Sequence, residues 1–321
     1  MKQRILISAA GVPTAFHLCE LIRTRFPKHF AVYLCDTNPK HLVAAAGFAH
    51  RFWTVPPANH PDFRRTLLDI LRIEQIEIYV PLVDKDVYTF PADDVELQTL
   101  GVRSTAPPAR SAAVLKSKRT LSGWLKTKSV AVPRVFTSSE VVDGGDSEEY
   151  FVKPDDGVGS RGASLMTAAQ LCKLAEEKVT DELLIQEVCK PPEYTVEVYN
   201  ARGKVVTICR ERLETKAGVC TKARIWTNSQ MQKLARKLCK ELELPVAFCF
   251  QVMRNKAGKW AVTDLNPRLG AGTSLSSICG WSLASAALVT WADLPMNPFQ
   301  YLPLFKSQRF AVRAYRDIRT R

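Results

Sequence analysis

The sequence has few histidines and no cysteine arrangement that would hold zinc. Five histidines and nine cysteines occur in 321 residues, and no Cys-X-X-Cys pair or Cys/His cluster has the spacing of a zinc site. Most cysteines from Cys189 onward stand within apolar runs, so we expect reduced and largely buried thiols. A catalytic cysteine is disfavoured because the sequence suggests no histidine partner for one.

Long apolar runs and the glycine pattern of dinucleotide-binding proteins are absent as well. No apolar stretch is long enough to span a bilayer. The short apolar run near the N-terminus is broken by Ser8 and Gly11, which favours a first strand over a signal peptide. We therefore expect a cytoplasmic protein with no membrane partner. Gly11 stands alone in its turn, so the GxGxxG pattern is missing and an NAD site is not supported.

Length and charge are the positive signals of the composition. With 46% hydrophobic and 24% charged residues, this is an ordinary globular sequence, and its length predicts two or three domains. The net charge of +13 suits an anionic small molecule or nucleic acid as a ligand. Basic residues are densest in the tail, 305–321, but no recognition motif accompanies them, so nucleic-acid binding is the disfavoured alternative.

The first 105 residues alternate between strands and helices. We predict strands at 4–8, 30–36 and 77–82, with helices at 14–25 and 62–73. This order predicts a parallel sheet with helices on both faces, in which ligand groups lie at the carboxyl ends of the strands. The polar residues at those ends are Ser8, Asp36, Asn38, Asp84 and Asp86.

The pattern changes after a proline-containing linker at 105–109. We predict helices at 111–128, 167–178 and 229–242, and strands at 130–136, 150–154, 183–187, 194–199 and 205–208. The strands after residue 190 are expected to pair antiparallel. The predicted division is 1–105, 106–186 and 187–321, and the predicted fold class is α/β with an α+β C-terminal part.

A predicted hairpin in the C-terminal part carries three oxygen donors. Apolar runs at 246–253 and 262–266 flank the turn 255–259. Asp264 and Asn266 share one face of their strand because side chains alternate along it, and Gln251 stands on the other strand. Such donors suit Mg²⁺, which usually shares its ligand shell with substrate phosphates. The alternative is a hairpin whose polar face is only solvated.

Lys153 precedes a glycine-rich turn, 155–164, that could hold phosphate. The glycines would let backbone N–H groups face an anion, Ser160 adds a hydroxyl donor, and Lys153 adds a positive charge. In a P-loop the lysine follows the glycines, whereas here it precedes them. An ordinary β-hairpin is the alternative.

Two further segments are candidates for nucleotide contacts. The apolar strand 183–188 offers a slot and backbone donors for a purine, and Glu193 could bind ribose hydroxyls, with an ordinary surface glutamate as the alternative. Residues 210–219 are predicted to form a charged loop. Arg210 and Arg212 of this loop could neutralise a transferring phosphoryl group, and a solvated surface is the alternative.

The order of these motifs resembles that of the ATP-grasp superfamily, and within it the carbamoyl-phosphate-synthase-like single-unit carboxylate–amine ligases. The resemblance covers nearly the whole chain. Its most specific parts are the block from Val152-Lys153-Pro154 to Gly162 and the block Asn266-Pro267-Arg268. The resemblance implies an ATP-grasp fold behind an N-terminal parallel-sheet pre-grasp domain, with a lid in 106–186 and a metal site in 187–321.

The resemblance also implies roles for single residues, with ATP and Mg²⁺ (or Mn²⁺) as cofactors. Those expected to contact ATP are Lys118, Lys153, Ser160, Gln186, Glu187, Val188 and Glu193. Those expected to bind the metal are Gln251, Asp264 and Asn266. Those expected to act in catalysis are Arg268, Lys153, Arg210 and Arg212. The chain departs from the family at Asp264, where glutamate is usual, and at Pro191 and Pro192, where a glycine usually precedes the ribose glutamate.

The resemblance implies that ATP activates a small carboxylate as an acylphosphate, which an amine then attacks. The expected partners are a small-molecule carboxylate and an amine, with a homodimer as the common assembly among relatives. Two alternatives remain. One is a non-catalytic nucleotide- or partner-binding protein on the same scaffold, and the other is nucleic-acid binding through the basic tail.

Overall fold

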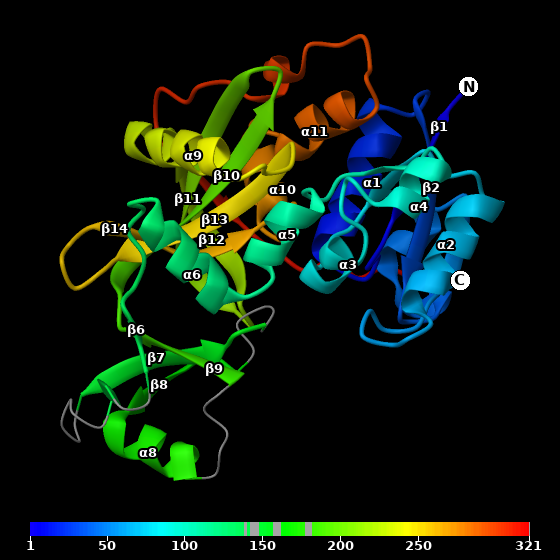
Figure 1. The fold of residues 1–321 in the computed structure, drawn as a ribbon. Helices are drawn as coiled ribbons and strands as arrows, with labels where there is room; N and C mark the ends of the chain where they lie inside the picture. The colour runs from blue at the N-terminus through cyan, green and yellow to red at the C-terminus, as the bar shows by residue number, and fades with distance from the viewer. Residues whose placement is uncertain (138–139, 142–147, 157–161, 177–181, 321) are drawn as a thin grey trace.

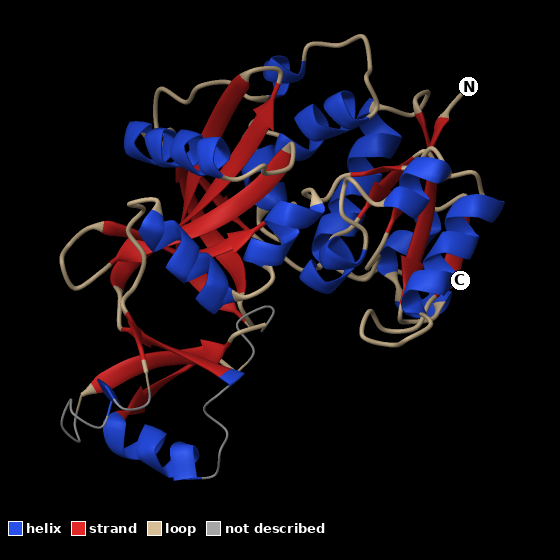
Figure 2. Ribbon diagram, viewed as in Figure 1, coloured by secondary structure: helices blue, strands red, loops and turns tan. Residues whose placement is uncertain are grey.

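The computed structural model describes residues 1–137, 140–141, 148–156, 162–176 and 182–320. Within these ranges the strands form a five-stranded, a six-stranded and a four-stranded sheet (Figures 1 and 2). Figure 1 shows the four-stranded sheet and its helix projecting away from the other two sheets. Across the described part of the chain, none of the helices combines the length and the apolar character needed to cross a membrane.

The N-terminal domain contains a parallel sheet, as predicted. Its strands lie in the order β3-β2-β1-β4-β5, and all of them run parallel. They are β1 (Gln3–Ile7), β2 (Phe30–Asp36), β3 (Arg51–Thr54), β4 (Ile78–Val80) and β5 (Arg103–Ser104). The accompanying helices are α1 (Pro13–Arg25), α2 (Phe63–Ile73), α3 (Asp84–Thr89) and α4 (Val95–Thr99), with short 3₁₀ turns η1 (Lys40–Leu42) and η2 (Ala44–Phe48).

Both faces of this sheet are buried because apolar residues follow one another along β1 and β2. Ile5 and Ile7 pack in the same core as α1, whereas Leu6 packs in a second core with α2. Continuous apolar strands of this kind are typical of parallel sheets that carry helices on both faces. The carboxyl ends of β1, β2 and β4 therefore lie at one common edge, where α3 begins.

The six-stranded sheet is antiparallel, in the order β14-β13-β10-β11-β12-β15. Its strands are β10 (Lys190–Ala201), β11 (Lys204–Lys216), β12 (Val219–Trp226), β13 (Ala247–Arg254), β14 (Trp260–Asn266) and β15 (Arg309–Val312). Helix α9 (Ser229–Glu241) belongs to one core of this sheet. The helices α10 (Thr273–Ile278) and α11 (Leu283–Trp291), with η4 (Pro298–Tyr301), belong to or pack against the core that also contains β1 and α1.

The predicted charged loop at 210–219 is wrong, because most of this segment lies in the long strands β11 and β12. Its charged side chains are accommodated by partners on neighbouring strands. Arg210 pairs with Glu197, Arg212 pairs with Glu193, and Lys222 pairs with Glu214. Opposite charges on adjacent strands stabilise such a sheet, so a charged sequence does not exclude strand structure.

The four-stranded sheet has its own core. It is antiparallel, in the order β6-β9-β7-β8, and α8 (Ala168–Glu176) packs on it. Its strands are β6 (Val135–Phe136), β7 (Glu149–Pro154), β8 (Ser164–Thr167) and β9 (Leu183–Glu187). The predicted strand 130–136 is confined to its last two residues. Pro133 lacks the N–H that a central strand position needs, which limits pairing before it.

The predicted helix 111–128 is two helices, α5 (Ala109–Leu115) and α6 (Lys118–Thr127). Ser117 has extended backbone angles and its side chain accepts a hydrogen bond from the Thr120 N–H, which starts the second helix. Leu115, Leu121 and Leu125 pack in the core of the six-stranded sheet. The division of the chain at 105 and 186 stays a prediction.

Candidate functional site

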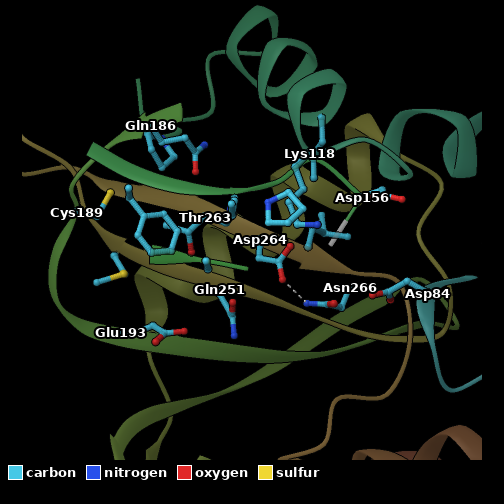
Figure 3. A pocket seen from close by; sticks show the side chains of 18 of the residues that line it. Asp84, Lys118, Asp156, Gln186, Cys189, Glu193, Gln251, Thr263, Asp264 and Asn266 are labelled. Carbon is cyan, nitrogen blue, oxygen red and sulfur yellow. Dashed lines mark hydrogen bonds between the residues drawn. The ribbon is translucent and has the colours of Figure 1, made fainter. Parts of the chain in front are cut away.

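A cavity of about 400 Å³ lies between the four-stranded and the six-stranded sheets (Figure 3). One wall comes from β7 and β9, the other from β10, β11, β13 and β14, and α3 of the N-terminal domain closes one end. The predicted site residues that line it are Lys118, Lys153, Gln186, Glu187, Val188, Glu193, Arg212, Gln251, Asp264 and Asn266.

The hairpin β13–β14 places three oxygen donors together in this cavity. Gln251 lies directly opposite Asp264 in the ladder, and the Asn266 Nδ2 donates a hydrogen bond to the Asp264 Oδ2 at 3.0 Å. One carboxylate and two amide oxygens form a hard donor set that suits Mg²⁺ if water or phosphate completes the shell. Within the described ranges, no cluster of three or more His, Cys, Asp or Glu side chains could hold a metal.

A bulge in the same hairpin provides a backbone oxygen that binds Lys153. The ladder pairs Gln251 with Asp264 but Val252 with Val262, so Thr263 is an extra residue in β14. The Lys153 Nζ donates to the Thr263 carbonyl oxygen at 2.8 Å, which fixes the lysine beside the donor set. Burial lowers the pKa of Lys153, and the Asp264 carboxylate opposes that shift.

Lys118 reaches the same region from α6. Its backbone N–H and its Nζ both lie 3.3 Å from the Asp155 carbonyl oxygen, so the first turn of α6 is tied to the end of β7. Figure 3 shows Lys118 above the hairpin that carries Asp264. Two lysines near one hard donor set can bind a polyanion together with its cation.

The opposite end of the cavity is more apolar. It is lined by Phe151, Leu165, Val188 and Met253, with Gln186 and Cys189 beside them. Glu187 is a predicted ATP contact, but its carboxylate already has partners within the protein. It accepts hydrogen bonds from the Arg134 backbone N–H at 2.7 Å and the Lys256 backbone N–H at 2.8 Å. The apolar side chains at this end of the cavity could receive a flat ring.

Glu193 and Arg212 form an ion pair on the floor of the cavity, with 3.2 Å between Oε1 and Nη1. Burial raises the pKa of Glu193, and the Arg212 guanidinium opposes this shift. Glu193 is 30% exposed on its side chain, so one face of the carboxylate is accessible to a ligand. Arg212 is more deeply buried and holds the carboxylate in place.

Two predicted catalytic arginines lie outside the cavity lining. Arg210 is buried under the loop that follows β14, where its Nε donates to the Glu197 Oε1 at 3.3 Å and its guanidinium packs on Gly272. Arg268 lies at the exit of β14, where it pairs with Asp84 at 2.7 Å and donates to the Asn266 Oδ1 at 3.3 Å. Arg268 therefore contacts two residues that line the cavity, whereas the side-chain partner of Arg210 is the buried Glu197, outside the lining.

The predicted Ser160 and most of the glycine-rich turn lie outside the described residues. Gly162, the last glycine of the turn, has a φ of +73°. A Cβ at this position would lie 3.0 Å from the Pro154 Cγ. Both observations explain why glycine follows the lysine strand at this point.

Sequence reasoning missed several residues that line the cavity. Tyr88 reaches it from α3 and donates to the Leu115 carbonyl oxygen at 3.0 Å, while Phe151, Leu165 and Met253 supply apolar surface. A single tyrosine or methionine carries no sequence signal for such a position. Asp84, by contrast, was expected at the carboxyl edge of the parallel sheet, and it lies there and lines the cavity.

Comparisons with known proteins agree with this architecture. The sequence profile of the ATP-grasp domain matches residues 115–272. The N5-carboxyaminoimidazole synthetase from Staphylococcus aureus, complexed with ADP, superimposes with a TM-score of 0.72 at 12% identity, over 92% of this chain and 79% of that chain. The carboxyaminoimidazole ribonucleotide synthase from Aspergillus clavatus, complexed with ATP, gives a TM-score of 0.72 at 15% identity, over 96% and 81%.

A third similar structure is an L-amino acid ligase from Bacillus licheniformis. It has a TM-score of 0.69 at 13% identity and covers 93% of this chain and 76% of its own. A search of curated protein sequences gave no match. The structural likeness shows a shared fold, and with the sequence profile it confirms the predicted fold: an N-terminal parallel sheet followed by the two antiparallel sheets that flank the cavity.

Proposed function

Because residues 115–272 of this chain form an ATP-grasp domain, we propose that the protein is an ATP-dependent carboxylate–amine ligase. One observation carries the proposal: the lysines Lys118 and Lys153 share a cavity with the donor set Gln251, Asp264 and Asn266. The proposal assigns the apolar end of the cavity to adenine, Glu193 to the ribose, and the lysines to the phosphates. The solved synthetase and synthase of similar fold that were complexed with ADP and ATP support a nucleotide as the ligand of this cavity.

Magnesium would be held by Gln251, Asp264 and Asn266, where its charge would offset that of the phosphates. The residues of the chain do the rest. Lys153, fixed by its bond to the Thr263 carbonyl, holds the transferring phosphate in line with the incoming carboxylate. The bond from the carboxylate oxygen to phosphorus forms as the bond to the ADP oxygen breaks, and Arg268 stabilises the charge on the phosphoryl oxygens.

The acylphosphate then reacts with an amine. The amine nitrogen bonds to the acyl carbon, phosphate leaves with the electron pair of the broken C–O bond, and the nitrogen loses a proton to solvent. The proposal assigns the entry of both substrates to the end of the cavity that α3 closes, where Asp84 and Asn266 meet. A small carboxylate and a small amine are the proposed substrate classes, and a homodimer is the proposed assembly.

A non-catalytic nucleotide-binding protein on this scaffold is the second candidate. Asp264 is the one carboxylate among the three hairpin donors, and a single carboxylate holds Mg²⁺ less firmly than two. That protein would bind MgADP without releasing ADP in response to any substrate pair.

Nucleic-acid binding through the basic tail is the other alternative. Arg313 of this tail donates a hydrogen bond to the Ala271 carbonyl oxygen, so this arginine has a partner within the protein.

The test is a screen for ADP release with amino acids and small carboxylic acids, singly and in pairs. The Lys153→Ala and Asp264→Ala variants should each lose activity by about a hundredfold or more, because Lys153 acts on the transferring phosphate directly and Asp264 would hold the Mg²⁺ that offsets its charge. Lys173→Ala is the matched control, since Lys173 is an exposed lysine on α8 of the same subdomain. Normal turnover by both site variants would refute the assignment, and binding of MgADP without turnover would favour the second candidate.

A further inference from the structure

Arg268 is held by a carboxylate from a distant part of the chain. Its Nε lies 2.7 Å from the Asp84 Oδ1, and its Nη2 lies 3.2 Å from the Asp84 Oδ2. The two side chains are 14% and 18% exposed. A two-point contact between a guanidinium and a carboxylate fixes the plane of the guanidinium as well as its distance.

Hydrogen bonds also connect the guanidinium of Arg268 to the donor set. The Arg268 Nη2 also donates to the Asn266 Oδ1 at 3.3 Å, and the Asn266 Nδ2 in turn donates to the Asp264 Oδ2 at 3.0 Å. Asp84, Arg268, Asn266 and Asp264 thus form one continuous hydrogen-bonded chain. Asp84 sits at its N-terminal-domain end and lines the cavity itself.

Asp84 is presented by an element that is firmly anchored. It is the first residue of α3, and Asp86 in the same turn accepts a 2.6 Å hydrogen bond from the Ser8 hydroxyl at the end of β1. Tyr88 ties the same helix to α5 through the Leu115 carbonyl. The N-terminal domain therefore fixes Asp84, and through it the guanidinium of Arg268.

We propose that Asp84 is a positioning residue for Arg268, which makes the N-terminal domain part of the phosphoryl-transfer machinery. The inference rests on the proposed ligase function. Without the two-point contact to Asp84, the buried guanidinium keeps only single hydrogen bonds of 3.3 Å to the Asn266 Oδ1 and the Leu269 carbonyl oxygen, which do not fix its plane. Small displacements of a charge at a transferring phosphate are costly. Because Arg268 does not line the nucleotide part of the cavity, the loss of Asp84 affects turnover and leaves nucleotide affinity unchanged.

The test combines Asp84→Asn and Asp84→Glu with a matched ion pair as control. Arg103 and Asp293 also join the N-terminal domain to the C-terminal part, but their side chains are 49% and 77% exposed and lie outside the cavity lining. Asp84→Asn should lower kcat for substrate-stimulated ADP release by about a hundredfold with Kd for MgADP unchanged. Asp84→Glu should recover about tenfold of that loss. Asp293→Asn should change neither quantity.

A double-mutant cycle separates positioning from any independent role of Asp84. In an Arg268→Gln background, Asp84→Asn should cost no more than about twofold, because the group that it positions is already absent. An equal loss in both backgrounds would overturn the inference. So would a wild-type kcat in Asp84→Asn, or a lowered KM for the carboxylate at unchanged kcat, which would make Asp84 a competitor for Arg268.

A spectroscopic measurement does not depend on turnover. The Arg268 Nε–H should give an exchange-protected NMR signal in the wild-type protein, assigned by its loss in Arg268→Gln, and Asp84→Ala, which leaves no side-chain acceptor, should abolish that protection. A wild-type chain with the protected signal but no substrate-stimulated ADP release would remove the proposed function, and the inference with it. An active wild type whose Asp84→Ala variant loses the signal but keeps its kcat would remove the positioning role alone.

Discussion

At the scale of single residues, the buried carboxyl group of Asp86 links stability to pH. Burial raises the pKa of Asp86 from 3.8 to about 6, the hydrogen bond from Ser8 opposes this shift, and Asp36 and Asp84 add to it. Between those two values the folded chain binds a proton that the unfolded chain does not. The free energy of unfolding contributed by Asp86 is therefore fully present below pH 3.8 and is lost as the pH rises through about 6.

Asp86→Asn tests this linkage because asparagine keeps an oxygen that can accept the Ser8 hydroxyl and cannot ionise. The variant should be more stable than wild type above pH 6, by about 3 kcal/mol at most, and the difference should shrink toward acid pH. Urea unfolding at several pH values measures the difference directly. Asp69→Asn, an exposed position on α2, is the control. A wild-type-to-variant difference that stays constant from pH 4 to pH 8 would contradict the linkage.

Arg210 and Arg212 show which features of single residues the sequence predicts and which it does not. Alternation predicts correctly that Asp264 and Asn266 share a face, because that relation depends only on local strand geometry. Arg210 and Arg212 also share a face, yet only Arg212 lines the cavity. The two positions differ in what packs over them, since Arg210 meets Gly272 from the loop after β14. That contact depends on tertiary packing, which no local pattern encodes.

At the scale of elements, the loop between β14 and α10 depends on a glycine. A Cβ on Gly272 would lie 2.1 Å from the Cζ of Arg210, whose side chain is itself held by Glu197. The guanidinium is buried, and moving it would break its bond to the buried Glu197. Gly272→Ala should therefore destabilise the protein by about 2 kcal/mol or more.

Gly123→Ala is the matched substitution. Gly123 lies within α6, nothing lies within 4 Å of its Cβ position, and alanine should stabilise the helix by about 0.5–1 kcal/mol. Chemical denaturation of both variants provides the measurement. Equal and small effects of the two substitutions would show that the loop repacks easily around Arg210.

Element prediction succeeded where one local signal dominated. The hairpin around 255–259 is confirmed because a glycine-containing turn separates two apolar runs. The predicted loop at 210–219 is wrong because cross-strand charge pairs stabilise a strand that looks solvated in isolation. The single helix predicted at 111–128 is divided by the Ser117 cap, a signal present in the sequence but masked by the helical pattern on either side.

At the scale of the whole molecule, one hydrophobic core joins two parts of the chain, whereas another is confined to one sheet and its helix. The core that contains Ile5 and Leu34 of the N-terminal sheet also contains Leu275 and Leu283 of the C-terminal part, so it joins the two. The four-stranded sheet has a separate core, formed by Phe136, Tyr150, Ile185 and their neighbours. The N-terminal domain and the six-stranded sheet should therefore open together, and the four-stranded sheet should open alone. Such independent opening is expected of an element that covers one side of a cavity.

Two matched truncations test this division by hydrogen exchange. Leu283→Ala and Ile185→Ala each remove a buried side chain, and each should cost about 2–5 kcal/mol in its own core. Leu283→Ala should speed amide exchange in both β1 and the six-stranded sheet, because these share one core. Ile185→Ala should speed exchange in β7 and β9 and leave β1 unchanged. If Leu283→Ala left β1 fully protected, the N-terminal domain would be an independent unit, and the route by which α3 fixes Arg268 would lose its support.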